Sequence, residues 1–178
     1  MLKAYADAFP QVELSLVCAP SPKSMEALAM GQVDLAVVEE QAGPSAGECL
    51  SVERLVWVGA KAGTGHLKRP LPVSLVADTC AFRPAALAAL TGHCVGWRTV
   101  FESGSMEAAL ATVRADMAVS AWLASTVPPD LDILPPSSGL PELPAFAINL
   151  HLPRHAEATV TKLARHIRDG LVRHRHAA

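Results

Sequence analysis

Polar and reactive side chains recur in this 178-residue sequence directly after apolar segments that predict strands. In open α/β sheets, ligands bind outside the carboxyl ends of the strands, where the free N–H groups of helix starts also point. Hydroxyl and N–H groups at such a place suit a carboxylate or a similar polar group. On this basis we predict that a small-molecule ligand contacts Ser21, Glu39, Thr79, Cys80, Ser103, Gly104, Ser105 and Ser125.

Ser21 and the run Ser103–Ser105 are the strongest of these predictions, because each opens a predicted helix. The alternative is that the serines only cap their helices by accepting a backbone N–H group. Cys80 falls at a predicted junction of strand and helix, where a helix N-terminus favours a reactive thiolate. A packed structural thiol is the favoured alternative for Cys80.

Motifs of catalysis are absent from the sequence, which contains no G-x-S-x-G, H-E-x-x-H, Walker A or G-x-G-x-x-G pattern. We therefore predict no catalytic residue, no cofactor and no metal site. A solvated helix face explains the late histidines, at 151, 155, 166, 174 and 176, better than metal ligation does. The cysteines, Cys18, Cys49, Cys80 and Cys94, form no C-x-x-C pair and are expected to be reduced thiols.

The elements that must position these side chains alternate between helix and strand. Apolar residues at helical spacing predict a helix over Leu2–Phe9, which Pro10 ends. Alternation predicts a half-buried strand at Val12–Leu16, and a helix with Ser21 as its N-cap follows. The apolar run Val33–Val38 predicts a strand buried on both faces, which is typical of a parallel sheet.

A Gly-, Lys- and Pro-rich loop at 61–72 separates this first lobe from a second one of the same pattern. We assign residues 1–60 to lobe I, with a return from about 145–178, and residues 61–144 to lobe II. Trp57 and Trp122 fall in predicted strands, which favours core packing over ligand stacking. The remaining predicted elements are strands at 55–58, 73–76, 97–101, 117–123, 131–134 and 146–152 and helices at 84–90, 106–113 and 157–173.

Composition excludes several classes of protein. The formal net charge is −2, so the chain lacks the basic excess of a free-standing nucleic-acid binder. No run of residues approaches the roughly 18 uninterrupted apolar residues of a membrane span. The N-terminus carries no secretory signal, so we expect a soluble cytoplasmic protein.

Several stretches, taken together, resemble the effector-binding domain of LysR-type transcriptional regulators over nearly the whole chain. They are Leu2–Leu14, with its helix followed by Phe9-Pro10-x-Val12, then Met25–Val38, which contains Gly31-x-Val33-Asp34-Leu35-Ala36, and later Glu102–Ser105 and Ala124–Pro128.

The resemblance implies an α/β fold of two lobes similar to type II periplasmic binding proteins, each lobe a mostly parallel sheet flanked by helices. It also implies a small-molecule effector in the cleft between the lobes, with contacts from the helix starts at Ser21 and Ser103–Ser105. Glu39 lies near a position that holds an arginine in responders to aromatic acids. The glutamate suits an effector with an amino group, or a neutral polar effector.

The resemblance further implies a homodimer or tetramer, with signalling through the geometry of the dimer. Family dimers pack the opening helix of one subunit against the helix of the second lobe that corresponds here to Met106–Val113. An alternative is that both helices are satisfied inside their own lobe. The implied interface residues are Leu2, Tyr5, Phe9, Met106, Ala109, Leu110 and Val113.

Two parts of the family pattern are missing from the sequence as given. The winged helix-turn-helix and its linker are absent, so we expect DNA to be contacted only through an N-terminal domain outside this chain. The first strand of lobe I is also absent. We therefore expect either that Glu13–Val17 pairs directly with Val33–Val38 or that strands are exchanged in a dimer.

Other functions remain open from the sequence. A dehydratase-like enzyme on the same fold would need an acid and a base from Glu39, Glu102 and Asp78. A solute-binding protein for transport would need an exported precursor, against which the absent signal argues. A redox sensor built on Cys80 and a second thiol is a variant of the main interpretation.

Overall fold

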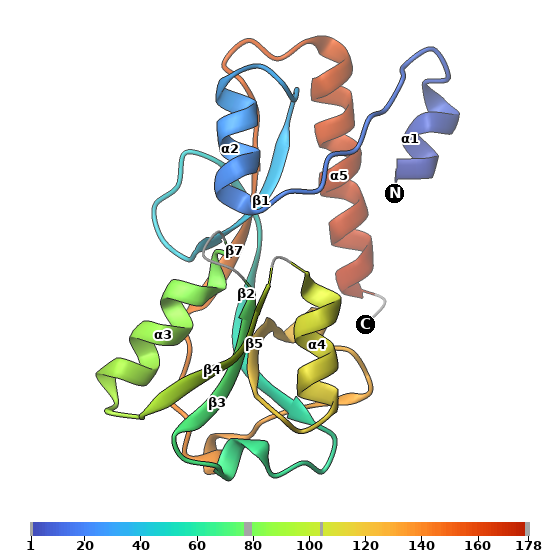
Figure 1. The fold of residues 1–178 in the computed structure, drawn as a ribbon. Coiled ribbons are helices and arrows are strands. Elements are labelled where there is room, and N and C mark those ends of the chain that lie inside the picture. Colours follow the sequence, from blue (N-terminus) through green and yellow to red (C-terminus); the bar gives the residue numbers. More distant parts are fainter. Residues whose placement is uncertain (1, 77–79, 104, 177–178) are drawn as a thin grey trace. The chain divides into compact units, whose positions relative to one another are not determined.

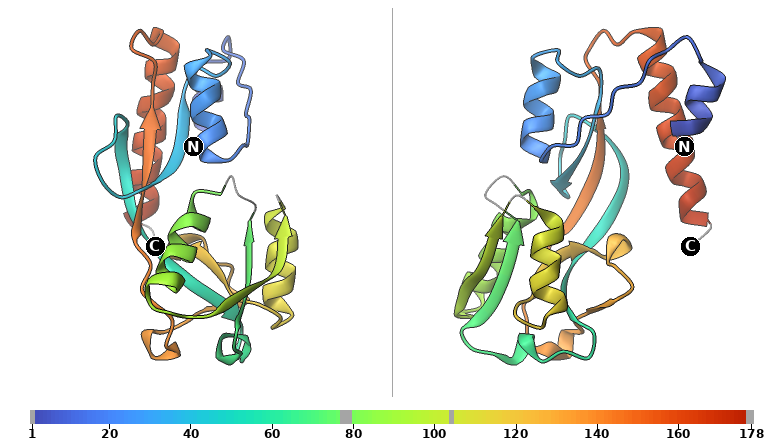
Figure 2. Two further views of the ribbon diagram at one scale, coloured as in Figure 1. Left: turned by 60° about the vertical axis from the view of Figure 1, so that its left-hand side comes forward. Right: turned by 45° about the vertical axis from the view of Figure 1, so that its right-hand side comes forward.

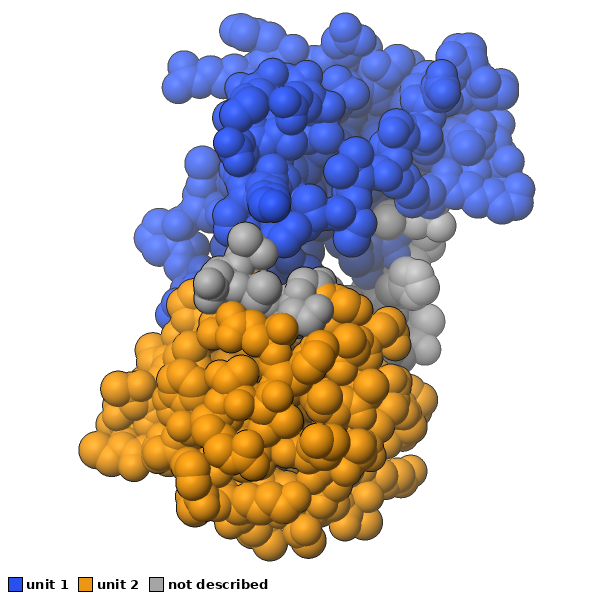
Figure 3. Space-filling view, in the orientation of Figure 1, with its two compact units in different colours: residues 1–51, 147–178 blue, residues 52–146 orange. Residues whose placement is uncertain are grey.

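The computed structural model of the chain describes residues 2–76, 80–103 and 105–176, and these form two compact units (Figure 1). Unit 1 comprises residues 1–51 and 147–178, and unit 2 comprises residues 52–146 (Figure 3). The division falls inside β2 (Glu48–Ala60) instead of the predicted loop at 61–72, because this strand continues unbroken for 13 residues. The assignment of residues to family lobes stays a prediction.

Unit 1 is built from α1 (Leu2–Ala8), α2 (Ser21–Ala29), β1 (Ala36–Gln41), the end of β7 (Ala145–His151) and α5 (Ala158–His176). Helix α1 lies beside α5 (Figures 1 and 2). Tyr5 is 1% exposed, and its hydroxyl donates to the carbonyl of Thr159 at 3.0 Å. Its ring contacts those of Phe9 and His166, so aromatic packing holds the two helices together.

The first predicted strand is absent from the structure. Residues 13–20 form neither helix nor strand, and Leu16 and Val17 are 73% and 69% exposed. The predicted pairing of Glu13–Val17 with Val33–Val38 is therefore wrong, because the sheet order β1-β7-β2-β5 gives β1 its neighbour in β7. Strand β1 begins three residues later than predicted, at Ala36, and Val37 is 43% exposed instead of buried. Strand exchange in a dimer stays a prediction.

Unit 2 contains β3 (Leu71–Val76), α3 (Phe82–Gly92), β4 (Trp97–Ser103), α4 (Met106–Arg114), β5 (Ser120–Leu123) and β6 (Leu131–Ile133). Strands β3 and β4 are parallel, and β2 pairs antiparallel with both β5 and β6. Helices α3 and α4 lie on opposite sides of the sheet (Figures 1 and 2). Three short 3₁₀ helices, at Gly65–Leu67, Ala124–Thr126 and Pro136–Ser138, complete the unit.

The core of unit 2 forms where α4 covers the sheet. Val58, Leu110, Val113, Trp122 and Leu131 form one buried cluster. Trp57 and Trp122 are 5% and 8% exposed, which confirms that they are core residues.

Four of the residues implied for a dimer interface are buried inside their own unit, namely Tyr5, Ala109, Leu110 and Val113, each at most 3% exposed. This is the alternative that the sequence left open for these side chains. Leu2 and Phe9 are partly buried, and Met106 is 54% exposed. The interface itself stays a prediction.

Asp116 connects the loop after α4 to the loop that contains Thr64 and Gly65. It follows α4 with a positive φ of 54°, and its carboxylate accepts the N–H groups of Thr64 at 3.0 Å and Gly65 at 2.8 Å. A Cβ atom at Gly63 would fall on this carboxylate, so the position requires glycine. The hydrogen bond from the Thr64 N–H group is the main cause that holds the pKa of Asp116 below its ordinary value.

Candidate functional site

The carboxyl ends of β3 and β4, the parallel pair of unit 2, lie at a common edge, as predicted for a parallel sheet. Val76, the last residue of β3, is in register with Ser103, the last residue of β4. Val119, which precedes β5, bridges to Val73 in the parallel direction. The segments that follow these ends carry the predicted positions Cys80, Ser105 and Ser125, whereas Thr79 and Gly104 lie outside the described residues.

Ser105 is the N-cap of α4, and its Oγ accepts the N–H group of Ala108 at 3.3 Å. Its side chain is exposed, as is that of Ser125 in the 3₁₀ turn after β5. Cys80, two residues before α3, is a partly buried free thiol. Ser105 therefore caps its helix and still faces solvent.

Arg83 in the first turn of α3 belongs to the same edge and was missed by the sequence analysis. Its guanidinium Nη2 lies 3.2 Å from Oε2 of Glu102 at the end of β4, and the two side chains are 14% and 39% exposed. An arginine in an Ala- and Pro-rich segment gave no periodic signal. The fold brings Arg83 and Glu102 together across 19 residues.

In unit 1, Ser21 and Glu39 are joined by two hydrogen bonds. The Ser21 hydroxyl donates to Glu39 Oε2 at 2.7 Å and accepts the backbone N–H group of Glu39 at 3.1 Å. Ser21 is 8% exposed and is the first residue of α2; the N-cap is Pro20, so the predicted capping role is wrong. Pro22 suits the first turn of the helix, and the Ser21 side chain bonds Glu39 of β1 instead of capping the helix.

A second carboxylate, Glu40, organises a polar cluster between β1 and β7. Its Oε2 accepts hydrogen bonds from Asn149 Nδ2, from Ser45 Oγ at 2.8 Å and from His151 Nε2 at 3.2 Å. Burial raises the pKa of Glu40, but these hydrogen bonds outweigh it and hold the pKa below its ordinary value. We call Glu40, Ser45, Asn149 and His151 the Glu40 cluster.

The Glu40 cluster was not predicted from the sequence, and one of its members was expected elsewhere. His151 was expected on a solvated face, but it is 7% exposed and Asn149 is 1% exposed. Both residues alternate with apolar ones along β7, a pattern that predicts an exposed face. A Cβ atom at Gly47 would fall on the imidazole ring of His151, so the loop after β1 closes directly over this ring.

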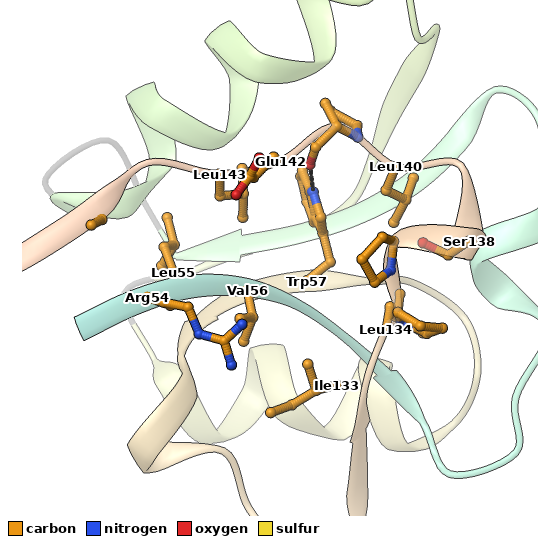
Figure 4. Close-up of a pocket in the computed structure, with 14 residues that line it drawn as sticks. Arg54, Leu55, Val56, Trp57, Ile133, Leu134, Ser138, Leu140, Glu142 and Leu143 are labelled. Carbon is orange, nitrogen blue, oxygen red and sulfur yellow. Dashed lines mark hydrogen bonds between the residues drawn. The ribbon is translucent and has the colours of Figure 1, made fainter.

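A cavity of about 380 Å³ lies within unit 2, between β2 and the segment that leads from β6 to β7 (Figure 4). Leu55, Leu134, Leu140 and Leu143 supply much of its apolar lining. The indole N–H group of Trp57 donates to the carbonyl of Pro141 at 2.8 Å, as the dashed line in Figure 4 shows. None of the predicted ligand-binding residues lines this cavity.

The described residues hold neither a cluster of metal ligands nor a membrane-spanning helix. Within residues 2–76, 80–103 and 105–176, no three or more His, Cys, Asp or Glu side chains come together as metal ligands would. In the same part of the chain, no helix has the length and apolar character needed to cross a membrane.

Comparison with known proteins gives a consistent result. The family described as the LysR substrate binding domain matches residues 1–174. The HTH-type transcriptional regulator DgdR of Burkholderia cepacia is 30% identical over 169 residues, which are 94% of this chain and 58% of DgdR. The chain thus spans little more than half the length of this relative.

Solved structures show the same fold. The regulatory domain of CcmR from Synechocystis PCC6803, in complex with 2-PG, is similar with a TM-score of 0.69 and 16% identity, covering 96% of this chain and 88% of that one. The bromide-bound regulatory domain of HypT from Salmonella typhimurium gives a TM-score of 0.71 and 14% identity, covering 96% and 90%. At such identities the likeness shows the fold alone.

Proposed function

Because the chain belongs to the LysR substrate-binding domain family, we propose that it senses a small-molecule effector for a transcriptional regulator. The match of residues 1–174 to this family is the observation that carries the proposal. DgdR, the relative that shares 30% of its residues, is a transcriptional regulator, and CcmR binds 2-PG through a domain of the same fold. We assign DNA contact to parts of such regulators outside the matched domain.

We propose that the effector contacts the residues predicted for it from the sequence. Unit 1 would supply Ser21 and Glu39, which the structure joins by hydrogen bonds. Unit 2 would supply the residues after its strand ends, namely Thr79, Cys80, Ser103, Gly104, Ser105 and Ser125. The exposed hydroxyls of Ser105 and Ser125 and the common edge of β3 and β4 support this assignment.

The charges of unit 1 favour an effector with an amino group or a neutral polar effector. Glu39 is hydrogen-bonded to a neutral hydroxyl, and in the described part of the chain it forms no ion pair with a lysine or arginine. A simple anion beside this carboxylate would be repelled. The bromide ion named for HypT therefore does not carry over to this chain.

We propose that the signal passes through the geometry of a cytoplasmic homodimer. Met106 on α4 is 54% exposed and Leu2 on α1 is partly exposed, so these side chains remain available to a second subunit. Tyr5, Ala109, Leu110 and Val113 would support such an interface from within their units.

We also propose that the domain is not an enzyme. The carboxylates that a dehydratase-like reaction would need already have partners: Glu39 bonds Ser21, and Glu102 pairs with Arg83. Asp78 lies outside the described residues. The relative DgdR is a transcriptional regulator, which also supports this proposal.

The proposal is tested by screening small metabolites for a rise in the melting temperature of the purified chain, followed by calorimetry and product analysis. We expect one saturable site per chain, no turnover, and at least tenfold tighter binding of amine-bearing compounds than of amine-free analogues. Equal binding of both analogues would contradict the effector class. Turnover of a compound would favour the enzyme.

A further inference from the structure

Two oxygen atoms of the Glu40 cluster accept no hydrogen bond from the residues that the structure describes. All three donors of the cluster, from Asn149, Ser45 and His151, bond the same atom, Glu40 Oε2. Glu40 Oε1 accepts no hydrogen bond from any described residue. The Glu40 side chain is 35% exposed, so a ligand can reach it.

The second open atom is Oδ1 of Asn149, which is buried and makes no hydrogen bond with the described residues. Its orientation is fixed, because rotating the amide by half a turn would bring an oxygen against the Glu40 carboxylate. A buried acceptor without a donor costs free energy, so the position is suited to an incoming N–H or O–H group. Because Asn149 and Glu40 are bonded to each other, the two open oxygens belong to adjacent groups.

The negative charge of Glu39 and Glu40 favours a ligand whose hydrogen-bond donor is a cation. Glu39 and Glu40 are consecutive, and neither forms an ion pair with a lysine or arginine of the described chain. His151 is the single group of the described chain that ion-pairs with Glu40, and it does so only when protonated. Carboxylates that lack a basic partner attract a cation and repel an anion.

We propose that the Glu40 cluster is a subsite for a primary ammonium group, which donates to Glu40 Oε1 and Asn149 Oδ1. An ammonium group has three donors and no acceptor, which matches an acceptor-rich site of negative charge. The inference rests on the proposed function in one respect, since it takes the effector as the source of the ammonium group. It moves the amine contact from Glu39, which Ser21 occupies, to Glu40.

The test is an NMR titration of the ¹⁵N-labelled chain with ethylammonium chloride, and with ethanol and potassium chloride as matched probes. We expect saturable shifts of the Asn149 side-chain amide and of the backbone amides at 40–41 and 149–151. Ethanol should bind at least tenfold more weakly, and potassium chloride should not reproduce the shifts. Equal shifts with potassium chloride or ethanol, or no shift with ethylammonium, would overturn the proposal.

Variants make the assignment specific. Glu40→Gln keeps the shape of the side chain and should weaken ethylammonium binding at least tenfold. Glu26→Gln, which removes an exposed carboxylate of α2, should leave binding unchanged. Unaltered binding in Glu40→Gln would overturn the inference, and the comparison of probes on the unmodified chain decides the matter if that variant does not fold.

The two proposals fail separately. An effector that binds the chain without perturbing the Glu40 cluster would overturn the subsite and keep the sensing function. Ethylammonium binding at the cluster, with no metabolite that stabilises the chain, would support the subsite and count against the sensing function.

Discussion

At the scale of single residues, two consecutive glutamates near the end of β1 form hydrogen bonds with different elements. Glu39 bonds Ser21 of α2, and Glu40 bonds Asn149 and His151 of β7. One dipeptide thus connects the edge strand of unit 1 to a helix and to the adjacent strand. Substitutions here affect stability as well as any ligand.

Ser21→Ala should lower the free energy of unfolding by about 1 to 2 kcal/mol, because the half-buried N–H group of Glu39 loses its acceptor. Urea denaturation followed by circular dichroism measures this change. Ser15→Ala, at an exposed position, is the control and should stay within about 0.5 kcal/mol. Equal stability of the two variants would show that the Ser21 bonds contribute nothing.

Asp116→Asn should destabilise the chain at neutral pH by about 1 kcal/mol, because an amide cannot accept the Thr64 and Gly65 N–H groups as a carboxylate does. The folded pKa of Asp116 is lowered, so its contribution is present above the ordinary value of 3.8 and is lost as the pH falls through the folded value. The difference in the free energy of unfolding between the variant and the original chain should therefore shrink below about pH 4.

Urea denaturation at a series of pH values checks this dependence. Asp34→Asn, at an exposed position, is the control and should stay within about 0.5 kcal/mol of the original chain. A gap between Asp116→Asn and the original chain that stays constant into acid would contradict the role given to the carboxylate.

At the scale of elements, α1 depends on α5 for its stability. A helix of seven residues is too short to persist alone, so its contacts through Tyr5 and Phe9 must hold it. Tyr5→Ala should detach α1 and remove hydrogen-exchange protection from residues 2–8, while α5 keeps its protection. Lys3→Ala, which breaks only an exposed ion pair to Asp7, should leave α1 protected. Retained protection in Tyr5→Ala would contradict this dependence.

The segment at residues 13–20, between α1 and α2, forms no helix or strand and exposes apolar side chains. Leu16 is 73% exposed, and extended segments of this kind tend to pair with other chains. Leu16→Lys should therefore reduce self-association, measured by sedimentation velocity, without lowering the melting temperature. Leu67→Lys, at a position that is 61% exposed in unit 2, should leave self-association unchanged. A chain that stays monomeric before any substitution would contradict the predicted strand exchange.

At the scale of the whole molecule, local patterns predicted most elements but not the contacts between them. The spacing of Met106, Ala109 and Val113 predicted α4, and Ser105 caps it as expected. Alternation predicted β7 within one residue of its observed bounds. The strand predicted at Val12–Leu16 does not form. Alternation of apolar and polar residues suits a strand, but a strand also needs a neighbour to pair with, and local sequence does not supply one.

The candidate site was predicted only in part, because local sequence patterns do not show which distant residues come into contact. Ser21 and Glu39 were each placed at a strand end or helix start, and the structure joins them across 18 residues. Asn149 and Glu40 are 109 residues apart, and a polar residue alternating with apolar ones gives no sign that it is buried. Arg83 and Glu102 were likewise separated by an entire helix and strand.

The central claim is the proposal that the chain binds a small-molecule effector through the predicted serines. The most direct test is calorimetry of one stabilising metabolite with Ser21→Ala from unit 1 and Ser105→Ala from unit 2. Each lost hydrogen bond should weaken binding about tenfold, which corresponds to about 1.4 kcal/mol. Binding that weakens in both variants is the predicted result. An affinity that responds to only one unit, or to neither, would contradict the account.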